Sequence, residues 1–173
     1  CEKITRLASV TRKVGRSGPL GFVTLEHEFV QDGFLCVSER QDLVYRPDPD
    51  PTSAVPVAPK VDGAAEQTRA VRFDTTLLFR YSALTFNGHR IHYDRAYAQN
   101  VEGYDGLVVH GPLLAQLLML WLEESAPLRQ FSFKATAPLL HFEQASLCRS
   151  GNALWVEGPD GRQCMTAECV LDT

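Results

Sequence analysis

A short polar segment near the middle of the chain carries side chains that could do proton chemistry. Residues 85–94, TFNGHRIHYD, bring together two imidazoles, an amide and a guanidinium. A little further along, residues 109–112 (VHGP) open a nearly all-apolar run. The N-terminus of a buried helix can polarise a carbonyl, because it presents free N–H groups and the positive end of the helix dipole. We hypothesise that the two segments form one site, which polarises a carbonyl and moves a proton beside it.

Helix signals flank both segments. Asp74 and the two threonines after it offer N-caps to a helix expected over residues 77–86, where apolar residues recur at helical spacing. Asp94 is expected to cap a second, short helix over residues 95–100. The polar segment should therefore connect two helices.

The main helix is expected to begin at Gly111-Pro112, with proline in the first turn, where its missing N–H costs least. Residues 113–122, LLAQLLMLWL, contain a single polar side chain, Gln116. This pattern predicts a helix that is buried nearly all round. At roughly 1.5 Å per residue the run is about 15 Å long, half a bilayer, so a membrane span is not expected.

The chain after the main helix has the patterns of strands. Residues 131–137, 153–157 and 163–171 are predicted strands, and GPDG at 158–161 is the turn between the last two. No strand alternates with a helix as in βαβ units, which disfavours a parallel sheet. One long buried helix followed by antiparallel strands fits the hotdog fold, an α+β architecture in which an antiparallel sheet wraps round a long central helix.

Three regions of the chain differ in composition. Residues 1–46 are predicted to form three antiparallel strands only, over residues 5–14, 22–30 and 34–45. Their apolar face needs a cover, either from the later chain or from upstream sequence, which the start at Cys1 without an initiator Met suggests is missing. Residues 47–69, with five prolines, are predicted to be a stiff linker to the main domain, residues 70–173.

Composition and charge exclude several classes of function. The 173 residues are 45% apolar and 22% charged, with a net charge of −4, which is ordinary for a soluble globular protein and argues against a nucleic-acid surface. The five cysteines lack the spacing of a disulfide framework, so reduced cysteines and a cytoplasmic protein are expected. The sequence has no phosphate loop, dinucleotide fingerprint or nucleophile elbow.

TFNGHRIHYD, the AYA that follows it and GLVVHGPLLAQLL at residues 106–118 resemble the hydratase signature of the MaoC-like hotdog dehydratases. The resemblance is closest to the branch holding mesaconyl-C4-CoA hydratase, itaconyl-CoA hydratase and type 2 hydroxyacyl-thioester dehydratase. It covers residues 70–173 and implies a hotdog fold there. Residues 1–46 resemble the last strands of a preceding hotdog repeat.

The resemblance implies roles for three residues. The family pattern is an acidic residue, any residue, Asn, Pro, an aliphatic residue and His, with His-Gly later at the entrance of the central helix. It places His92 on the catalytic histidine, Asn87 on the catalytic aspartate and Gly111 on the glycine whose amide helps form the oxyanion hole. An amide is not a base near neutral pH. We therefore predict His92 as the acid–base group, Asn87 as the residue that orients water and Gly111 as the oxyanion donor.

Three more residues are candidate substrate contacts. Arg90 could face a free substrate carboxylate, such as mesaconyl and itaconyl groups carry, or it could be a surface arginine. His110 could contact substrate or serve a structural role by capping carbonyls. His89 stands with Arg90 where the family has Asn-Pro. A metal site is not expected, because His89 and His92 have no firm third ligand.

The predicted function is hydration of an α,β-unsaturated acyl-CoA of mesaconyl or itaconyl type, or the dehydration of a 3-hydroxyacyl thioester. No cofactor beyond the CoA thioester itself is expected, and no nucleic-acid or membrane partner. Because hotdog sheets commonly pair edge to edge, a homodimer or higher homo-oligomer is expected. A hotdog thioesterase and a non-catalytic acyl-CoA-binding module are the alternatives. The hydratase requires His92, Asn87 and the Gly111 N–H to converge on one cleft, with an acyl tunnel beside the main helix.

Overall fold

The structure is a computed structural model that describes residues 1–15, 18–47 and 57–172. The chain divides into two compact units, Cys1–Val55 and Pro56–Thr173, each with a sheet of its own. The division falls inside the proline-rich segment.

The second unit contains a five-stranded antiparallel sheet in the order β4-β6-β7-β8-β5. Its strands are β4 (Gln67–Val71), β5 (Leu128–Ala135), β6 (Ala145–Ser150), β7 (Ala153–Glu157) and β8 (Gln163–Leu171). The three strands that the sequence predicts in this region correspond to β5, β7 and β8. The short 3-10 turn η2 (Pro159–Gly161) connects β7 to β8, where a turn is predicted.

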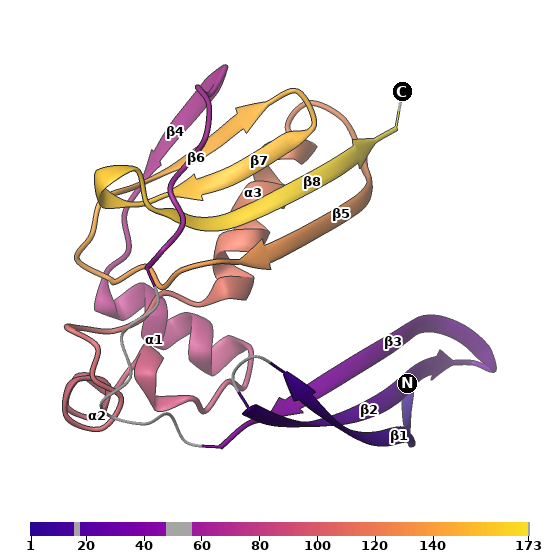
Figure 1. Cartoon of the computed structure of the whole chain (residues 1–173). Helices are drawn as coiled ribbons and strands as arrows, with labels where there is room; N and C mark the ends of the chain where they lie inside the picture. The colour runs from indigo at the N-terminus through magenta and orange to yellow at the C-terminus, as the bar shows by residue number, and fades with distance from the viewer. Residues whose placement is uncertain (16–17, 48–56, 173) are drawn as a thin grey trace. The chain divides into compact units, whose positions relative to one another are not determined.

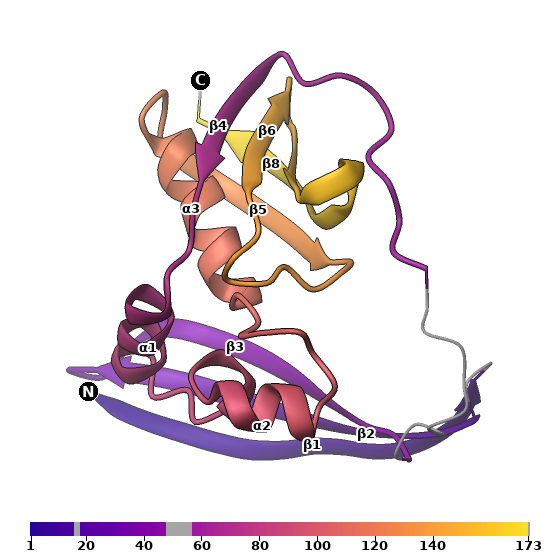
Figure 2. The same ribbon diagram turned by 90° about the vertical axis from the view of Figure 1, so that its left-hand side faces the viewer.

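The central helix α3 (Gly111–Glu123) lies against one face of this sheet (Figures 1 and 2). It contacts β5 and β8, and its buried side chains are Leu113, Leu114, Ala115, Leu118, Trp121 and Leu122. Leu120 is 53% exposed and Gln116 is also exposed. The prediction of burial nearly all round is wrong, because the sheet covers one face of the helix only.

Two shorter helices precede α3. In α1 (Thr75–Leu84) the Asp74 side chain accepts the N–H of Leu77, and in α2 (Arg95–Asn100) the Asp94 side chain accepts the N–H of Tyr97. Both predicted N-caps are therefore confirmed. In both views α1 and α2 lie at the N-terminal end of α3 (Figures 1 and 2).

Strands β4 and β6 are absent from the sequence prediction. They pair with each other, from Gln67↔Arg149 to Val71↔Ala145, and β4 starts inside the predicted linker. Within the predicted linker, the backbone of residues 59–61 pairs with the segment between β7 and β8 and the start of β8: the N–H of Gln163 donates to Pro59 (2.8 Å) and that of Val61 to Gly161 (2.9 Å). These contacts are long-range in sequence, so local composition does not reveal them. Residues 48–56 of the linker lie outside the described residues.

The first unit is a three-stranded antiparallel sheet in the order β1-β2-β3, as predicted, made of β1 (Glu2–Gly15), β2 (Gly18–Gln31) and β3 (Phe34–Tyr45). Asp32 and Gly33 join β2 to β3 with φ of 51° and 80°. Two positive φ values in a two-residue loop are typical of a type I′ hairpin turn, for which Asp-Gly is a favoured pair. Within the described residues, the buried apolar core, from Phe73 to Cys169, belongs entirely to the second unit.

Three further findings concern the described residues as a whole. All five cysteines are free thiols. No helix in the described ranges is long and apolar enough to span a membrane. Nor do three or more His, Cys, Asp or Glu side chains gather there in the manner of a metal site.

Candidate active site

The turn after α1 positions the polar segment. The Asn87 backbone N–H donates to the Ser82 carbonyl oxygen (2.9 Å), and the Asn87 side-chain oxygen accepts the N–H of His89 (3.0 Å). Phe86 adopts a φ of 52°, in the left-handed region that is unfavourable for an aromatic residue. The turn ends α1 at Leu84, before the predicted end at Phe86, and leads into the single 3-10 turn η1 (Arg90–His92).

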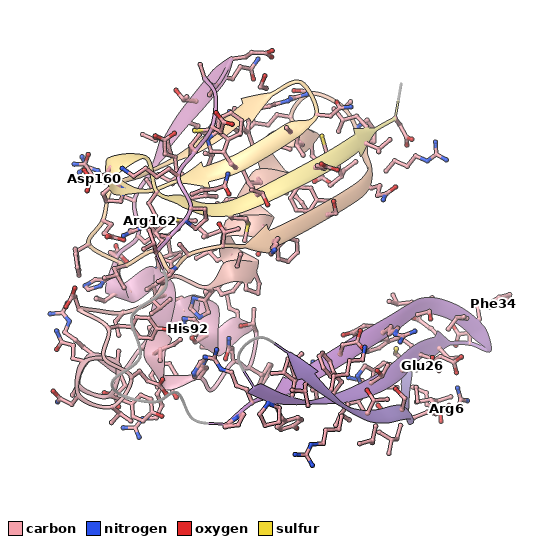
Figure 3. All side chains as sticks on the ribbon, in the orientation of Figure 1. Arg6, Glu26, Phe34, His92, Asp160 and Arg162 are labelled. Carbon is pink, nitrogen blue, oxygen red and sulfur yellow. The ribbon has the colours of Figure 1, made fainter. Side chains whose placement is uncertain are left out.

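His92, at the end of η1, is buried and has one ring nitrogen fixed. His92, labelled in Figure 3, is 7% exposed. Its Nδ1 lies 2.7 Å from the carbonyl oxygen of Val108. A carbonyl only accepts, so neutral His92 carries its proton on Nδ1 and a lone pair on Nε2. Burial lowers the pKa of His92 below 6.5, partly offset by the Val108 hydrogen bond. His92 is therefore a neutral base at neutral pH.

His110 lies directly against His92 and caps the central helix. The two imidazole rings are stacked, with centroids 3.8 Å apart and planes 18° from parallel. His110 is the N-cap residue of α3 and is 0% exposed. Its Nε2 lies 2.8 Å from the Ser82 hydroxyl oxygen. Burial, together with the charge that His92 and His89 would carry, lowers its pKa from 6.5 to about 4.

Gly111 follows His110 as the first residue of α3. Its N–H is one of those that helix geometry leaves without an intrahelical partner, at the positive end of the helix dipole. Since His92 stacks on the residue before Gly111, the structure brings the imidazole and the entrance of α3 together. The predicted proximity of these two elements is therefore confirmed, while the catalytic roles remain predictions.

The structure favours the structural alternative for His110. A side chain that is 0% exposed has no surface to offer a substrate, and the His110 ring contacts Ser82 and His92 instead. His89 is exposed and meets the edge of the His92 ring, with centroids 5.4 Å apart. Of the two histidines predicted to contact substrate, only His89 lies at the surface.

Arg90 is exposed, and its side chain contacts residues close to it in the chain. Its guanidinium donates to the Asp94 carboxylate (2.7 Å) and lies over the Tyr97 ring at 4.1 Å from the centroid. The pKa of Asp94 is lowered, by the Tyr97 N–H first and by Arg90 second. To bind a substrate carboxylate, Arg90 would have to exchange this partner for the new one.

A groove of about 300 Å³ adjoins the site. It is mainly apolar and is lined by Phe79, Ser82, Ala83, Phe86, Asn87, Gly88 and Tyr93. Ser82 thus connects the groove to buried His110, and Asn87 connects it to the backbone of His89. It follows α1 and the turn after it, rather than α3 as predicted for the acyl tunnel.

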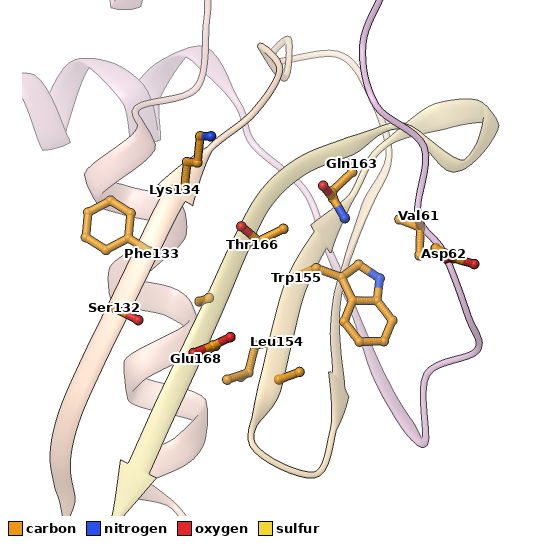
Figure 4. Close-up of a pocket in the computed structure, with 12 residues that line it drawn as sticks. Val61, Asp62, Ser132, Phe133, Lys134, Leu154, Trp155, Gln163, Thr166 and Glu168 are labelled. Atoms are coloured by element: carbon orange, nitrogen blue, oxygen red, sulfur yellow. The ribbon is translucent and has the colours of Figure 1, made fainter.

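A larger cavity, of about 540 Å³, lies on the side of the sheet that faces away from α3 (Figure 4). Trp155, Lys134, Gln163, Thr166 and Glu168 line it, with Val61 and Asp62 from the segment before β4. None of the predicted site residues belongs to this cavity, so its size does not make it the candidate active site.

Ser82 is the site residue that sequence reasoning misses. It is 6% exposed on α1 and holds the ring of a histidine 28 positions later in the chain. A serine at the end of a helical pattern gives no local sign of such a contact. The one available signal is that Ser82 falls on the same face of α1 as buried Leu78, four residues earlier.

The sheet, the central helix and the histidine at its entrance define a hotdog-fold protein, and solved structures confirm the fold. HtdX from Mycobacterium tuberculosis matches 96% of this chain and 67% of its own, with a TM-score of 0.69 and 18% identity. A MaoC-like dehydratase from Phytophthora capsici matches 99% of this chain and 62% of its own, with a TM-score of 0.67 and 12% identity. At such identities the likeness concerns the fold alone.

The chain belongs to the hydroxyacyl-thioester dehydratase type 2 family, whose model matches residues 1–141. Mesaconyl-C(4)-CoA hydratase of Chloroflexus aurantiacus is 46% identical over 177 residues, which is 95% of this chain and 61% of that protein. The mitochondrial type 2 hydroxyacyl-thioester dehydratase of Schizosaccharomyces pombe is 29% identical over 130 residues, 71% of this chain and 42% of its own. The chain thus spans about six tenths or less of these relatives.

Proposed function

We propose that this protein is a hydro-lyase that adds water across the double bond of an α,β-unsaturated acyl-CoA, or removes it in the reverse direction. The observation that carries the proposal is the buried His92, whose Nδ1 contact leaves the lone pair on Nε2 and whose ring is stacked at the entrance of α3. The 46% identity to a protein named mesaconyl-C(4)-CoA hydratase supports it.

The geometry suggests a role for each of these groups in the reaction. The Gly111 N–H and the positive end of α3 stabilise the thioester oxygen as it takes on enolate charge. His92 Nε2 removes a proton from water while the water oxygen bonds to the β-carbon. The same Nε2 then returns a proton to the α-carbon, and the enolate collapses to the thioester. Dehydration is the reverse sequence.

Asn87 is proposed to orient the attacking water. Its side-chain oxygen already accepts the His89 N–H, but a carbonyl oxygen has a second lone pair, and the Asn87 NH₂ group has two donors. The turn that fixes the Asn87 backbone also fixes where this amide can hold water. Asn87 supplies no base, so His92 alone accounts for the proton movements.

The substrate is proposed to be a CoA thioester of mesaconyl or itaconyl type, or a 3-hydroxyacyl thioester. The identity to the Chloroflexus protein favours the first, and the apolar groove beside Asn87 suits the acyl part of the last. The chemistry needs no further cofactor.

A steady-state assay of the full-length protein with crotonyl-CoA and mesaconyl-C4-CoA tests the proposal. We expect hydration of at least one thioester, and loss of about a thousandfold in kcat for His92→Ala, within the range of general acid–base catalysis, with thioester binding retained. Release of free CoA would instead indicate a thioesterase. Binding without turnover would indicate a non-catalytic acyl-CoA-binding module.

The assembly and location are also proposals. β4 and β5 form the two edges of the five-stranded sheet, and an edge strand offers unpaired backbone groups to another sheet. The three strands of the first unit are proposed to be the end of a preceding hotdog repeat, and the protein to be a cytoplasmic homodimer or larger homo-oligomer. Sedimentation of the full-length protein would establish its oligomeric state.

A further inference from the structure

The contact between Ser82 and His110 has no part in the reaction as proposed, yet it is buried and polar. Ser82 is 6% exposed and His110 0%, and the hydroxyl oxygen lies 2.8 Å from Nε2. The other ring nitrogen of His110, Nδ1, is buried without a hydrogen-bond partner among the described residues. The serine hydroxyl can donate or accept, so the surroundings of the other nitrogen decide the tautomer.

The position of His110 at the start of α3 indicates which tautomer that is. Nδ1 is the ring nitrogen next to Cγ and therefore the one nearer the backbone of this N-cap residue. The N-terminus of a helix favours negative charge density and disfavours a further N–H proton. Nδ1 thus carries the lone pair, and Nε2–H donates to the Ser82 hydroxyl oxygen.

The hydrogen bond also fixes the plane of the ring. The χ2 torsion of histidine is broad, so the ring needs an outside contact to hold one angle. Ser82 holds the His110 ring at Nε2, the nitrogen further from Cγ. At a centroid distance of 3.8 Å the His92 ring is in van der Waals contact with it, so rotation of His110 would displace His92.

We propose that Ser82 is a positioning residue: its hydroxyl accepts from Nε2–H and fixes the plane of the His110 ring, which in turn supports the His92 ring against the entrance of α3. The importance of this contact for turnover rests on the proposed hydratase function. The contact itself can be tested without any substrate.

Nitrogen NMR of the histidine rings tests the structural part. The His110 signals are assigned by their loss in His110→Gln. In the unsubstituted protein we expect Nδ1 without a proton and Nε2 with one, as a single tautomer. In Ser82→Ala we expect the His110 ring to lose its fixed plane, seen as broadened or shifted His110 signals, together with a changed His92 signal. Alanine is the best helix former, so this variant should retain α1.

Ser150→Ala is the matched control. It removes a serine hydroxyl that hydrogen-bonds Glu66 at 3.1 Å, elsewhere in the same unit. We expect it to leave the His110 and His92 signals unchanged. A proton on His110 Nδ1 in the unsubstituted protein, or His110 and His92 signals unaffected by Ser82→Ala, would overturn the proposal.

Kinetics test the functional part. We expect Ser82→Ala to lower kcat about tenfold, the effect of one hydrogen bond, with little change in KM. In a His110→Gln background, Ser82→Ala should have almost no further effect, because it acts through His110. Additive effects would contradict the positioning role. If the unsubstituted protein hydrates neither thioester while the NMR changes occur as expected, the proposed function fails and the Ser82–His110 assignment stands.

Discussion

The candidate site has an inner and an outer layer that are held in different ways. The inner layer, Ser82, His92 and His110, is buried, and its contacts join residues far apart in the chain. The outer layer, Asn87, His89 and Arg90, is held by neighbours two to seven positions away. Damage to the fold should therefore disturb the inner layer first, whereas the outer layer depends mainly on its own turn.

The difference also separates chemistry from recognition. Burial keeps the inner imidazoles neutral, as a base requires, and prevents His110 from meeting substrate. The outer side chains keep access to solvent and can meet a substrate that approaches. The proposed reaction thus places proton transfer on the inner layer and orientation of water and substrate on the outer one.

The pH dependence of unfolding tests the inner layer, and has the largest expected effect. The unfolded chain protonates His110 below about pH 6.5, but the folded protein does so only near pH 4. Stability should be complete above pH 6.5 and should fall as the pH is lowered toward 4, by about 3 kcal/mol from this residue alone. The lowered pKa of His92 adds in the same direction. Urea denaturation at several pH values measures the effect.

His110→Gln is the control for that experiment. Glutamine does not titrate in this range, so the variant should lose most of the decrease between pH 6.5 and 4, whatever its stability at pH 7. A decrease of unchanged size in His110→Gln would show that the pH dependence arises elsewhere and that the inner layer does not hold a neutral His110.

The sequence predicts the identity of several site residues, but not the contacts between those that are far apart in the chain. His92, Gly111 and the caps at Asp74 and Asp94 follow from motif and residue type, because caps and turns are made by near neighbours. The stacking of His92 on His110 and the role of Ser82 do not, because tertiary packing decides them. The partner of Arg90 lies only four positions away, yet the sequence equally allows a substrate carboxylate.

The same reasoning explains the strands. β7 and β8 flank a GPDG turn and are rich in apolar residues, so they are predicted. β4 has the sequence QTRAV, with polar residues on an edge strand, and β6 has the sequence ASLCRS. Neither shows alternation strong enough to distinguish it from a loop. Their pairing joins segments about eighty residues apart, which local pattern does not encode.

Asn87→Ala tests the outer layer, with a smaller expected effect. It removes both the acceptor for the His89 N–H and the proposed water contact. We expect kcat to fall about tenfold, as for loss of one hydrogen bond in the transition state, with little change in global stability. Steady-state kinetics and thermal denaturation measure both quantities.

Asn87→Asp tests the turn contact of Asn87 separately from its amide donors. Aspartate keeps an acceptor for the His89 N–H and therefore the turn, but replaces the amide donors by a carboxylate. If Asn87→Ala and Asn87→Asp lower kcat alike, the amide itself matters to the reaction. Full activity of Asn87→Asp would show that the amide donors are not needed for the reaction.

Arg90 offers the smallest expected effect and the sharpest test of substrate class. Because Arg90 and Asp94 form an exposed pair, their separation should cost less than about 1 kcal/mol. Arg90→Gln should raise KM a few-fold for mesaconyl-C4-CoA, which carries a free carboxylate, and leave KM for crotonyl-CoA unchanged. Asp94→Asn keeps an N-cap for α2 while removing the charge that occupies Arg90. It should therefore lower KM for the carboxylated thioester only. If neither variant distinguishes the two thioesters, Arg90 is a surface arginine, and recognition of the acyl group falls to the apolar groove beside Asn87.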